Sequence, residues 1–292
     1  MKLTFNQEEP FRILQFTDLH LRELPFDEKD LQTLQMIESL IHKEQPDLVI
    51  FTGDMVWGTI IENPLATFEE FLNFCNLLEV PIALTYGNHD TNHASVNRAL
   101  FRMNEQKLVN QVNKSHRIIF NHRENYVIEL YDKKGMEIQQ VLFVLDSGEY
   151  LNNQISRYEW MLPEQVEWLR KTMLFYRQEY RVKQSLVFQH IPVHEYMDAY
   201  QFNHPENGVI EGFRVDSPGL NTGLFATLLL DESIKGLIVG HNHNNNFQTN
   251  YLGLELIFGQ VSGYGADANI QRGARLIELS KNTFQSKIIY DE

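Results

Sequence analysis

The stretch Pro81-Ile82-Ala83-Leu84-Thr85-Tyr86-Gly87-Asn88-His89-Asp90 leads from an apolar run directly into polar residues that can bind a metal ion or transfer a proton. Short apolar runs of this kind are typical of strands that are covered on both faces. In layered α/β folds, ligands bind beyond the carboxyl ends of such strands. The polar residues at the end of this run are therefore candidates for a functional site.

Four other apolar runs end in the same way. The residues at their ends are Asp18-Leu19-His20, Gly53-Asp54, His190 and Gly240-His241-Asn242-His243. Because all five clusters follow strand-like runs, we expect them to meet at one place in the fold. The residues expected there are Asp18, His20, Asp54, Asn88, His89, Asp90, His190, His241 and His243.

The first part of the chain alternates strands and helices. Apolar residues recur at helical spacing over residues 28–43 and again from about 68 to 78, and each of these segments lies between two of the apolar runs. This order predicts a parallel sheet with right-handed crossovers. Residues 1–10 are expected to be a polar lead-in, and a further helix is expected from about 93 to 105.

The second part of the chain has a different character. Closely spaced apolar runs between residues 117 and 145 predict antiparallel strands, and Pro163 begins a predicted helix that continues to about residue 180. Residues 195–221 lack periodicity and are expected to form a long irregular loop, a kind of segment that often serves as a lid. A short helix is expected over residues 223–230, and strands return between residues 246 and 290.

These patterns predict an α/β fold in which two β-sheets pack face to face with helices outside them. We expect one domain over residues 1–292, with its core in about residues 11–290, because no linker or repeat divides the chain. The composition is 43% hydrophobic and 22% charged, which is typical of a globular chain. The single cysteine, Cys75, excludes an intramolecular disulfide and is expected to be buried on a helix.

The formal net charge of −14 argues against nucleic acid and anionic membrane surfaces as partners. The chain has no apolar run of about 18 residues and no apolar leader, so we expect a cytoplasmic protein. A small phosphorylated substrate is compatible with an acidic protein, because bound metal ions make a pocket locally positive.

The donor residues indicate a site for two divalent metal ions. Two carboxylates, one amide and four imidazoles exceed what one ion binds, and they come from Asp18, His20, Asp54, Asn88, His190, His241 and His243. Nitrogen and oxygen ligands without a thiolate suit Mn, Fe or Zn. Two such ions about 3.5–4 Å apart can share a bridging hydroxide that attacks phosphorus. His89 is left over as a general acid, and Asp90 is expected to orient it.

In their order along the chain, the five clusters resemble the calcineurin-like metallophosphoesterase superfamily. The resemblance covers about residues 11–290 and implies a four-layer α/β/β/α sandwich of two mixed β-sheets flanked by helices. It assigns the first metal ion to Asp18, His20 and His243. It assigns the second metal ion to Asn88, His190 and His241. Asp54 would bridge the two ions, and His89 would be the general acid.

Within the superfamily, three stretches resemble a small purple-acid-phosphatase-like group. They are Thr222-Gly223-Leu224-Phe225, Gly263-Tyr264-Gly265 and Arg272-Gly273-Ala274-Arg275. Purple enzymes place a tyrosine ligand three residues after the bridging aspartate. This chain has Trp57 there, so the charge-transfer colour is not expected. The group often has an aspartate where this chain has Asn246, so we expect a different environment around the metal ligands.

The resemblance implies a metal-dependent phosphohydrolase that cleaves phosphomonoester or phosphodiester bonds. One alternative is a cyclic-nucleotide phosphodiesterase or nuclease of the same superfamily, and another is a metal-binding regulatory module without turnover. Loops 146–162 and 195–221 are expected to determine substrate choice, and Tyr150 and Tyr158 in the first loop can either pack or stack on a leaving group. Weaker candidates for substrate contacts are His194, Asn221 and Tyr264.

Overall fold

The computed structural model describes residues 1–5, 9–151, 153–203, 205, 208–212 and 214–291. In this part of the chain the strands form two mixed sheets. The smaller sheet contains β2 (Phe11–Phe16), β3 (Leu48–Thr52), β4 (Ile82–Thr85), β12 (Gly273–Leu279) and β13 (Phe284–Tyr290). Its order is β13–β12–β2–β3–β4, in which β2, β3 and β4 are parallel and β12 is antiparallel to both β2 and β13.

The larger sheet contains β1 (Leu3–Thr4), β5 (Ser115–Phe120), β6 (Arg123–Tyr131), β7 (Ile138–Leu145), β8 (Ser185–Phe188), β9 (Ile234–Val239), β10 (Gln248–Tyr251) and β11 (Leu254–Phe258). Its order is β1–β6–β7–β8–β9–β11–β10, and β5 also pairs with β6. The antiparallel pairing predicted for the middle of the chain is confirmed in β5, β6 and β7. From β7 through β8 and β9 to β11 the neighbouring strands are parallel.

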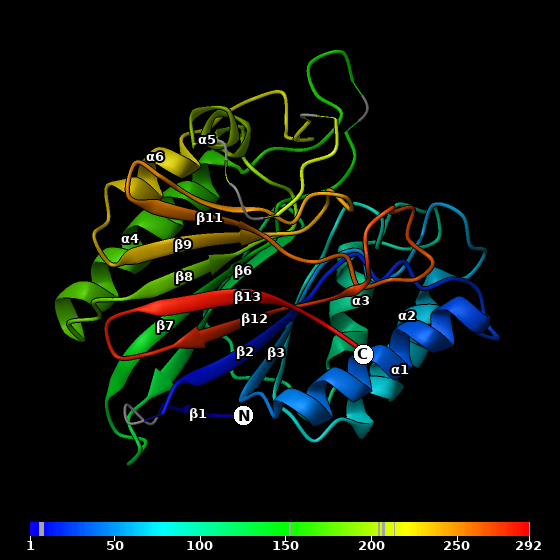
Figure 1. Ribbon diagram of the computed structural model, residues 1–292, viewed down its shortest axis with the longest axis horizontal. Coiled ribbons are helices and arrows are strands. Elements are labelled where there is room, and N and C mark those ends of the chain that lie inside the picture. Colours follow the sequence, from blue (N-terminus) through cyan, green and yellow to red (C-terminus); the bar gives the residue numbers. More distant parts are fainter. Residues whose placement is uncertain (6–8, 152, 204, 206–207, 213, 292) are drawn as a thin grey trace.

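Helices cover the outer face of each sheet (Figure 1). The smaller sheet packs against α1 (Glu28–Glu44), α2 (Pro64–Leu77) and α3 (Arg98–Glu105). The larger sheet packs against α4 (Pro163–Glu179), α5 (Glu195–Asn203) and α6 (Leu224–Leu229). A third apolar cluster fills the space between the sheets. The α/β/β/α sandwich with two mixed sheets is therefore confirmed.

Strand β2 shows how alternation creates these layers. Leu14 and Phe16 belong to the cluster under the helices, whereas Ile13 belongs to the cluster between the sheets. Gln15 is also buried between the sheets, and its Nε2 donates to Oγ1 of Thr52 at 2.8 Å and to the carbonyl of Val239 at 3.2 Å. The bond to Val239 joins the two sheets, and the bond to Thr52 links β2 to β3 within the smaller sheet, both close to the carboxyl ends of the strands.

Capping residues determine where the helices on the smaller sheet begin. Asp27 caps α1 by accepting from the amides of Lys29 and Asp30 at 2.8 and 3.0 Å. Asn97 caps α3 by accepting from the amide of Leu100 at 3.0 Å, so this helix begins later than the expected position near residue 93. Cys75 is fully buried on α2, as expected.

Two elements are absent from the sequence prediction. The lead-in contains β1, which pairs in parallel with β6. The segment 195–221 contains α5, because Tyr196 is buried on the larger sheet and its hydroxyl donates to the carbonyl of Leu237 at 2.6 Å. Residues 204, 206–207 and 213 of that segment lie outside the described residues. Among the described residues, no helix combines the length and apolar character needed to span a membrane.

Candidate metal centre

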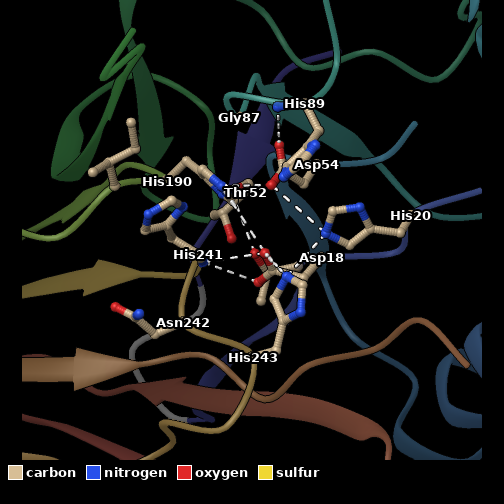
Figure 2. A network of polar contacts seen from close by, with 12 residues as sticks. Asp18, His20, Thr52, Asp54, Gly87, His89, His190, His241, Asn242 and His243 are labelled. Atoms are coloured by element: carbon tan, nitrogen blue, oxygen red, sulfur yellow. Dashed lines mark hydrogen bonds and ion pairs between the residues drawn. The ribbon is translucent and has the colours of Figure 1, made fainter. Parts of the chain in front are cut away.

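The predicted donor residues come together at the carboxyl ends of strands from both sheets (Figure 2). The smaller sheet places Asp18, His20, Asp54, Asn88 and His89 after β2, β3 and β4. The larger sheet places His190, His241 and His243 after β8 and β9. Figure 2 shows the His241 and His243 rings directed into the cluster and the intervening Asn242 side chain directed away from it.

Unusual backbone conformations direct several of these side chains. The φ angles of Asp18, His20, Asp54 and His241 are 57°, 50°, 53° and 75°. A non-glycine residue in this left-handed region costs of order 1–3 kcal/mol and persists only where the surrounding structure holds it. Gly87 permits a close approach, since a Cβ atom there would lie 2.2 Å from Oδ1 of Asp54. The backbone conformations of the turns after the strands therefore place the donor side chains in the site.

Asp18, His20 and His243 form the first donor group. The Nε2 atoms of His20 and His243 are 2.9 Å apart, and Nε2 of His243 is 3.5 Å from Oδ1 of Asp18. When two nitrogen ligands each lie about 2.1 Å from one ion and the angle between their bonds is a right angle, the nitrogens are about 3 Å apart. The two rings therefore have the spacing of ligands that share an ion. Nδ1 of His243 lies 3.0 Å from the carbonyl of Asp267, which leaves Nε2 free to bind metal.

Asp54, His190 and His241 form the second donor group. Nδ1 of His190 lies 2.8 Å from the carbonyl of Thr52, which again leaves Nε2 free. That Nε2 is 3.0 Å from Oδ2 of Asp54, but the two atoms are not aligned as a hydrogen bond. The same Oδ2 is 3.7 Å from Nε2 of His20 in the first group. Asp54 thus lies where a bridging ligand would be expected.

Several buried polar atoms of the site have no hydrogen-bond partner among the described residues. They are Nδ1 of His20, Oδ2 of Asp54, both amide atoms of Asn88, Nε2 of His190 and both ring nitrogens of His241. An unsatisfied buried polar group costs about 1–3 kcal/mol, and such groups in a native fold call for an explanation. Coordination of metal ions would satisfy Oδ2 of Asp54, Oδ1 of Asn88, Nε2 of His190 and one ring nitrogen of His241, so the residues present fit a centre of two divalent ions.

Burial and neighbouring charges shift the pKa values of Asp54 and His190 in opposite directions. Burial alone would raise the pKa of Asp54, but the imidazoles of His190 and His89 hold it well below its usual range. Burial would lower the pKa of His190, but the Asp54 carboxylate raises it to about 9. Burial and neighbouring imidazoles lower the pKa of His20 and His241, which keeps both rings in the neutral form that binds metal.

His89 lies at the border between the donor groups and the solvent. Its Nε2 is 2.9 Å from the hydroxyl of Tyr150, and its Nδ1 is 3.0 Å from Oγ1 of Thr59. His89 also belongs to a third potential metal group with His20 and Asp54. The geometry therefore allows His89 either to face a substrate or to ligate an ion.

The predicted role of Asp90 as the partner of the His89 ring is wrong. The Asp90 carboxylate instead accepts from the backbone amides of Asp54, Val56 and Gly87 at 2.9, 2.9 and 2.7 Å. Among the described residues, no hydrogen bond joins Asp90 to His89. Asp90 therefore holds the backbone that follows β3 against the backbone that follows β4. Burial and the nearby Asp54 charge raise the pKa of Asp90 to about 7, although Arg98 and the amides oppose this shift.

The sequence did not predict a role for Arg98, which is hydrogen-bonded to the loop that follows β4. Its side chain is 1% exposed, and its Nη2 donates to the carbonyls of Gly87 and Gly148 at 2.8 and 3.1 Å. Its Nε is 3.2 Å from Asp146 and 3.6 Å from Glu149. Because it lies on α3, ten residues away from the Asn88 donor, only the folded structure reveals the connection.

Arg98→Met is expected to lower the free energy of unfolding by about 3–5 kcal/mol, because it leaves buried carboxylates without their cation. Denaturant unfolding of the two proteins measures the difference. The matched control is Arg170→Met on α4, where the side chain is 54% exposed and pairs with the exposed Glu167, and it is expected to leave stability unchanged. Equal stability of Arg98→Met and wild type would contradict the supporting role of Arg98.

A cleft of about 750 Å³ opens over the donor residues. Besides Asp54, His89, His241 and His243, its described lining residues include Tyr150, Arg157, Tyr158, Glu211, Asp216, Asn242, Asn244 and Asp267. These residues come from both loops that were expected to determine substrate choice and from the segments after β9 and β11. The general location of substrate contacts could thus be predicted, but the individual residues could not.

The three weaker candidates for substrate contacts are not among the described residues that line this cleft. His194 and Asn221 line a different cavity, where His194 bonds to Oγ of Ser217 at 2.8 Å and Asn221 donates to Glu195 at 2.8 Å. Tyr264 packs against the apolar cluster under α1 and α2. Their polarity and their loop positions suggested the prediction, but those features do not determine the direction of a side chain.

The two positions that depart from purple enzymes differ in their relation to the site. Trp57 lies beside it, with its ring edge-on to His20 at a centroid distance of 4.9 Å. Asn246 is buried, donates to Gln260 at 2.8 Å and accepts from the amide of Val209 at 2.6 Å. In the described structure Asn246 is therefore hydrogen-bonded to the loop that contains Val209 and has no contact with the donor groups.

Comparison with known proteins agrees with this geometry. A family model described as calcineurin-like phosphoesterase matches residues 11–245, and the chain belongs to this family. Among solved structures, a dimetal phosphatase from Danio rerio has a TM-score of 0.69 at 12% identity, with 96% of each chain covered. The GAP50 protein of Plasmodium has a TM-score of 0.60 at 12% identity, covering 97% of this chain and 85% of that one. At this identity, the two structures support the fold alone.

Relatives by sequence include plant and yeast proteins. Probable inactive purple acid phosphatase 29 of Arabidopsis thaliana is 28% identical over 96% of this chain and 79% of its own length. Phosphatase DCR2 of Saccharomyces cerevisiae is 25% identical over 84% of this chain and 46% of its own length. The relationship to purple-acid-phosphatase-like proteins predicted from the sequence motifs is thereby confirmed.

Proposed function

We propose that this protein is a dinuclear metal-dependent phosphohydrolase that cleaves phosphomonoester or phosphodiester bonds of small substrates. The observation that carries the proposal is Oδ2 of Asp54, which has no hydrogen-bond partner among the described residues and lies between two groups of potential metal donors next to an open cleft. When bound, two divalent ions supply positive charge that attracts phosphate and lowers the pKa of water.

The residues of the chain would bind the two ions, position the loops and donate a proton. The first ion would be held by Asp18, His20 and His243, and the second by Asn88, His190 and His241, with Asp54 between them. Asp90 keeps the two loops that carry Asp54 and Asn88 together. His89 presents Nε2 toward the cleft, where it can deliver a proton to the leaving oxygen.

The test is the hydrolysis of p-nitrophenyl phosphate and bis-p-nitrophenyl phosphate after chelation and after return of Mn²⁺, Zn²⁺ or Fe²⁺. We expect turnover that chelation removes and added metal restores. The ratio of monoester to diester activity chooses between a phosphatase and a phosphodiesterase. Hydrolysis of cyclic nucleotides or nucleic acid far above that of both small esters would favour the first alternative.

A non-catalytic metal-binding module is the second alternative, because three plant relatives are named probable inactive phosphatases. That description belongs to those proteins. In this chain the seven donors and His89 are all present, and the carboxylates and imidazoles among them lie in three overlapping groups next to a cleft. Protein that binds two ions and hydrolyses no phosphoester would favour the module.

A cytoplasmic location and the exclusion of nucleic-acid partners stay predictions.

Removal of metal is expected to lower the melting temperature, because ions that bind only the folded state stabilise it by mass action. The stabilisation is about 4 kcal/mol when the free metal exceeds its dissociation constant about 1,000-fold. Thermal melts with chelator and with added metal measure the shift. Asp54→Asn is the control and should lose most of it, and an equal shift in this variant would place the binding elsewhere.

A further inference from the structure

Residues 149–151 and 153–159, which we call the arm, contribute Tyr150, Arg157 and Tyr158 to the lining of the cleft. Its two sides pair with each other: the amide of Leu151 donates to the carbonyl of Arg157 at 2.9 Å, and the amide of Glu159 donates to the carbonyl of Glu149 at 2.8 Å. Tyr150 and Tyr158 form an antiparallel bridge between these two bonds. The arm is therefore a defined structural element and not an irregular loop.

The base of the arm is tied to the loop that carries Asn88. The carboxylate of Glu149 accepts from the hydroxyl of Thr91 and lies 3.6 Å from Nε of Arg98. The carboxylate of Glu159 accepts from the amide of Glu149 at 2.9 Å and pairs with Arg123 at 2.9 Å. These contacts hold the arm in register with the donor groups.

Three side chains of the arm, those of Tyr150, Arg157 and Tyr158, face the site. The ring of Tyr158 is edge-on to His241 at a centroid distance of 4.5 Å, and the hydroxyl of Tyr150 is 2.9 Å from Nε2 of His89. The guanidinium of Arg157 lies 5.7 Å from the ring centroid of Tyr150 and 5.3 Å from that of Tyr158. The two rings thus support a cation at the edge of the cleft.

The charged residues that line the cleft in the described structure are one cation and several carboxylates. Among the described lining residues, Arg157 is the one arginine or lysine, whereas Glu211, Asp216 and Asp267 contribute carboxylates. Asp216 is paired with Arg214 at 2.5 Å, and the described residues that donate to the Glu211 carboxylate do so through amide side chains, such as that of Asn244 at 2.6 Å. Within the described part of the chain, Arg157 forms no ion pair with a carboxylate. Its charge is therefore available to an anionic ligand.

We propose that Arg157 is a specificity-determining residue that binds the non-bridging oxygens of a phosphoryl group and makes the enzyme prefer phosphomonoesters to phosphodiesters. This inference rests on the proposed function. A monoester carries up to two negative charges and presents three terminal oxygens, whereas a diester carries one charge and presents two. A guanidinium forms bidentate, charge-assisted bonds to such oxygens, so the monoester gains more from Arg157.

Steady-state kinetics of the metal-loaded protein test this inference. Arg157→Gln is expected to raise the KM for p-nitrophenyl phosphate about 10-fold to 100-fold, the range typical of a lost charge-assisted hydrogen bond. The KM for bis-p-nitrophenyl phosphate should change less than about threefold, and Arg157→Lys should lie between wild type and Arg157→Gln. The control Arg170→Gln, on the exposed face of α4, should change neither value.

Calorimetric titration with inorganic phosphate gives a readout without turnover. In the metal-loaded protein, Arg157→Gln is expected to raise the dissociation constant about 10-fold at unchanged metal content. An unchanged constant, or an equal rise in KM for both esters, would overturn the inference. If wild type hydrolyses neither ester, the proposed function fails, and the phosphate titration still decides whether Arg157 recognises the phosphoryl group.

Discussion

Asp54→Asn is expected to reduce phosphoester turnover at least about 1,000-fold, because several kcal/mol of stabilisation by the second ion would be lost. The substitution preserves shape, and an amide oxygen can still accept from the amide of His89, which lies 2.7 Å from Oδ1. It removes the charged Oδ2 that lies 3.0 Å from His190 and 3.7 Å from His20. The protein should therefore fold but hold fewer ions.

Metal content and activity of the Asp54→Asn protein are measured together. Elemental analysis should fall from two ions per chain to one or none, in parallel with turnover. Asp198→Asn serves as the matched control, because Asp198 is exposed on α5, and it should retain both ions and full activity. Full activity of Asp54→Asn with two bound ions would remove the basis for a bridging carboxylate.

His89→Gln is expected to lower kcat by about 100-fold to 10,000-fold for an alkyl phosphate, because an alkoxide leaves slowly without a proton donor. The loss for p-nitrophenyl phosphate should be much smaller, since nitrophenolate leaves without a proton. Metal content should stay at two ions per chain. This comparison of leaving groups measures proton donation separately from binding.

The matched control for His89→Gln is His93→Gln, in which the changed ring bonds to Ser95 and does not line the cleft in the described structure. It should leave both substrates unaffected. An equal loss for both leaving groups would mean that His89 does not donate the proton. Loss of an ion would assign His89 to the potential metal group that it shares with His20 and Asp54.

Strand ends made most of the donor set predictable. Runs such as 12–17 and 235–239 are mostly apolar and end directly before polar residues, so both the strands and the candidate ligands after them can be recognised in the sequence. The geometry is not visible there. The left-handed backbone of Asp18 and His241, with φ of 57° and 75°, depends on contacts between two sheets.

Roles that depend on neighbours distant in sequence were beyond prediction. Asp90 is adjacent to His89 in sequence, yet its carboxylate faces the amides of Asp54 and Val56. His194 is only four residues from His190, yet it lies at another cavity. Arg157 lies in a stretch without a periodic sequence pattern, and its position among carboxylates from later segments appears only in the folded structure. Sequence spacing identifies candidates, whereas packing decides which way they point.

The most direct test of the central claim is a titration of chelated protein with Mn²⁺, in which bound metal and hydrolysis of p-nitrophenyl phosphate and bis-p-nitrophenyl phosphate are followed in the same samples. We expect no turnover in the metal-free protein, saturation at two ions per chain, and phosphoester hydrolysis that rises as the second ion binds. Saturation at one ion, hydrolysis by the metal-free protein, or no hydrolysis of either ester with two ions bound would contradict it.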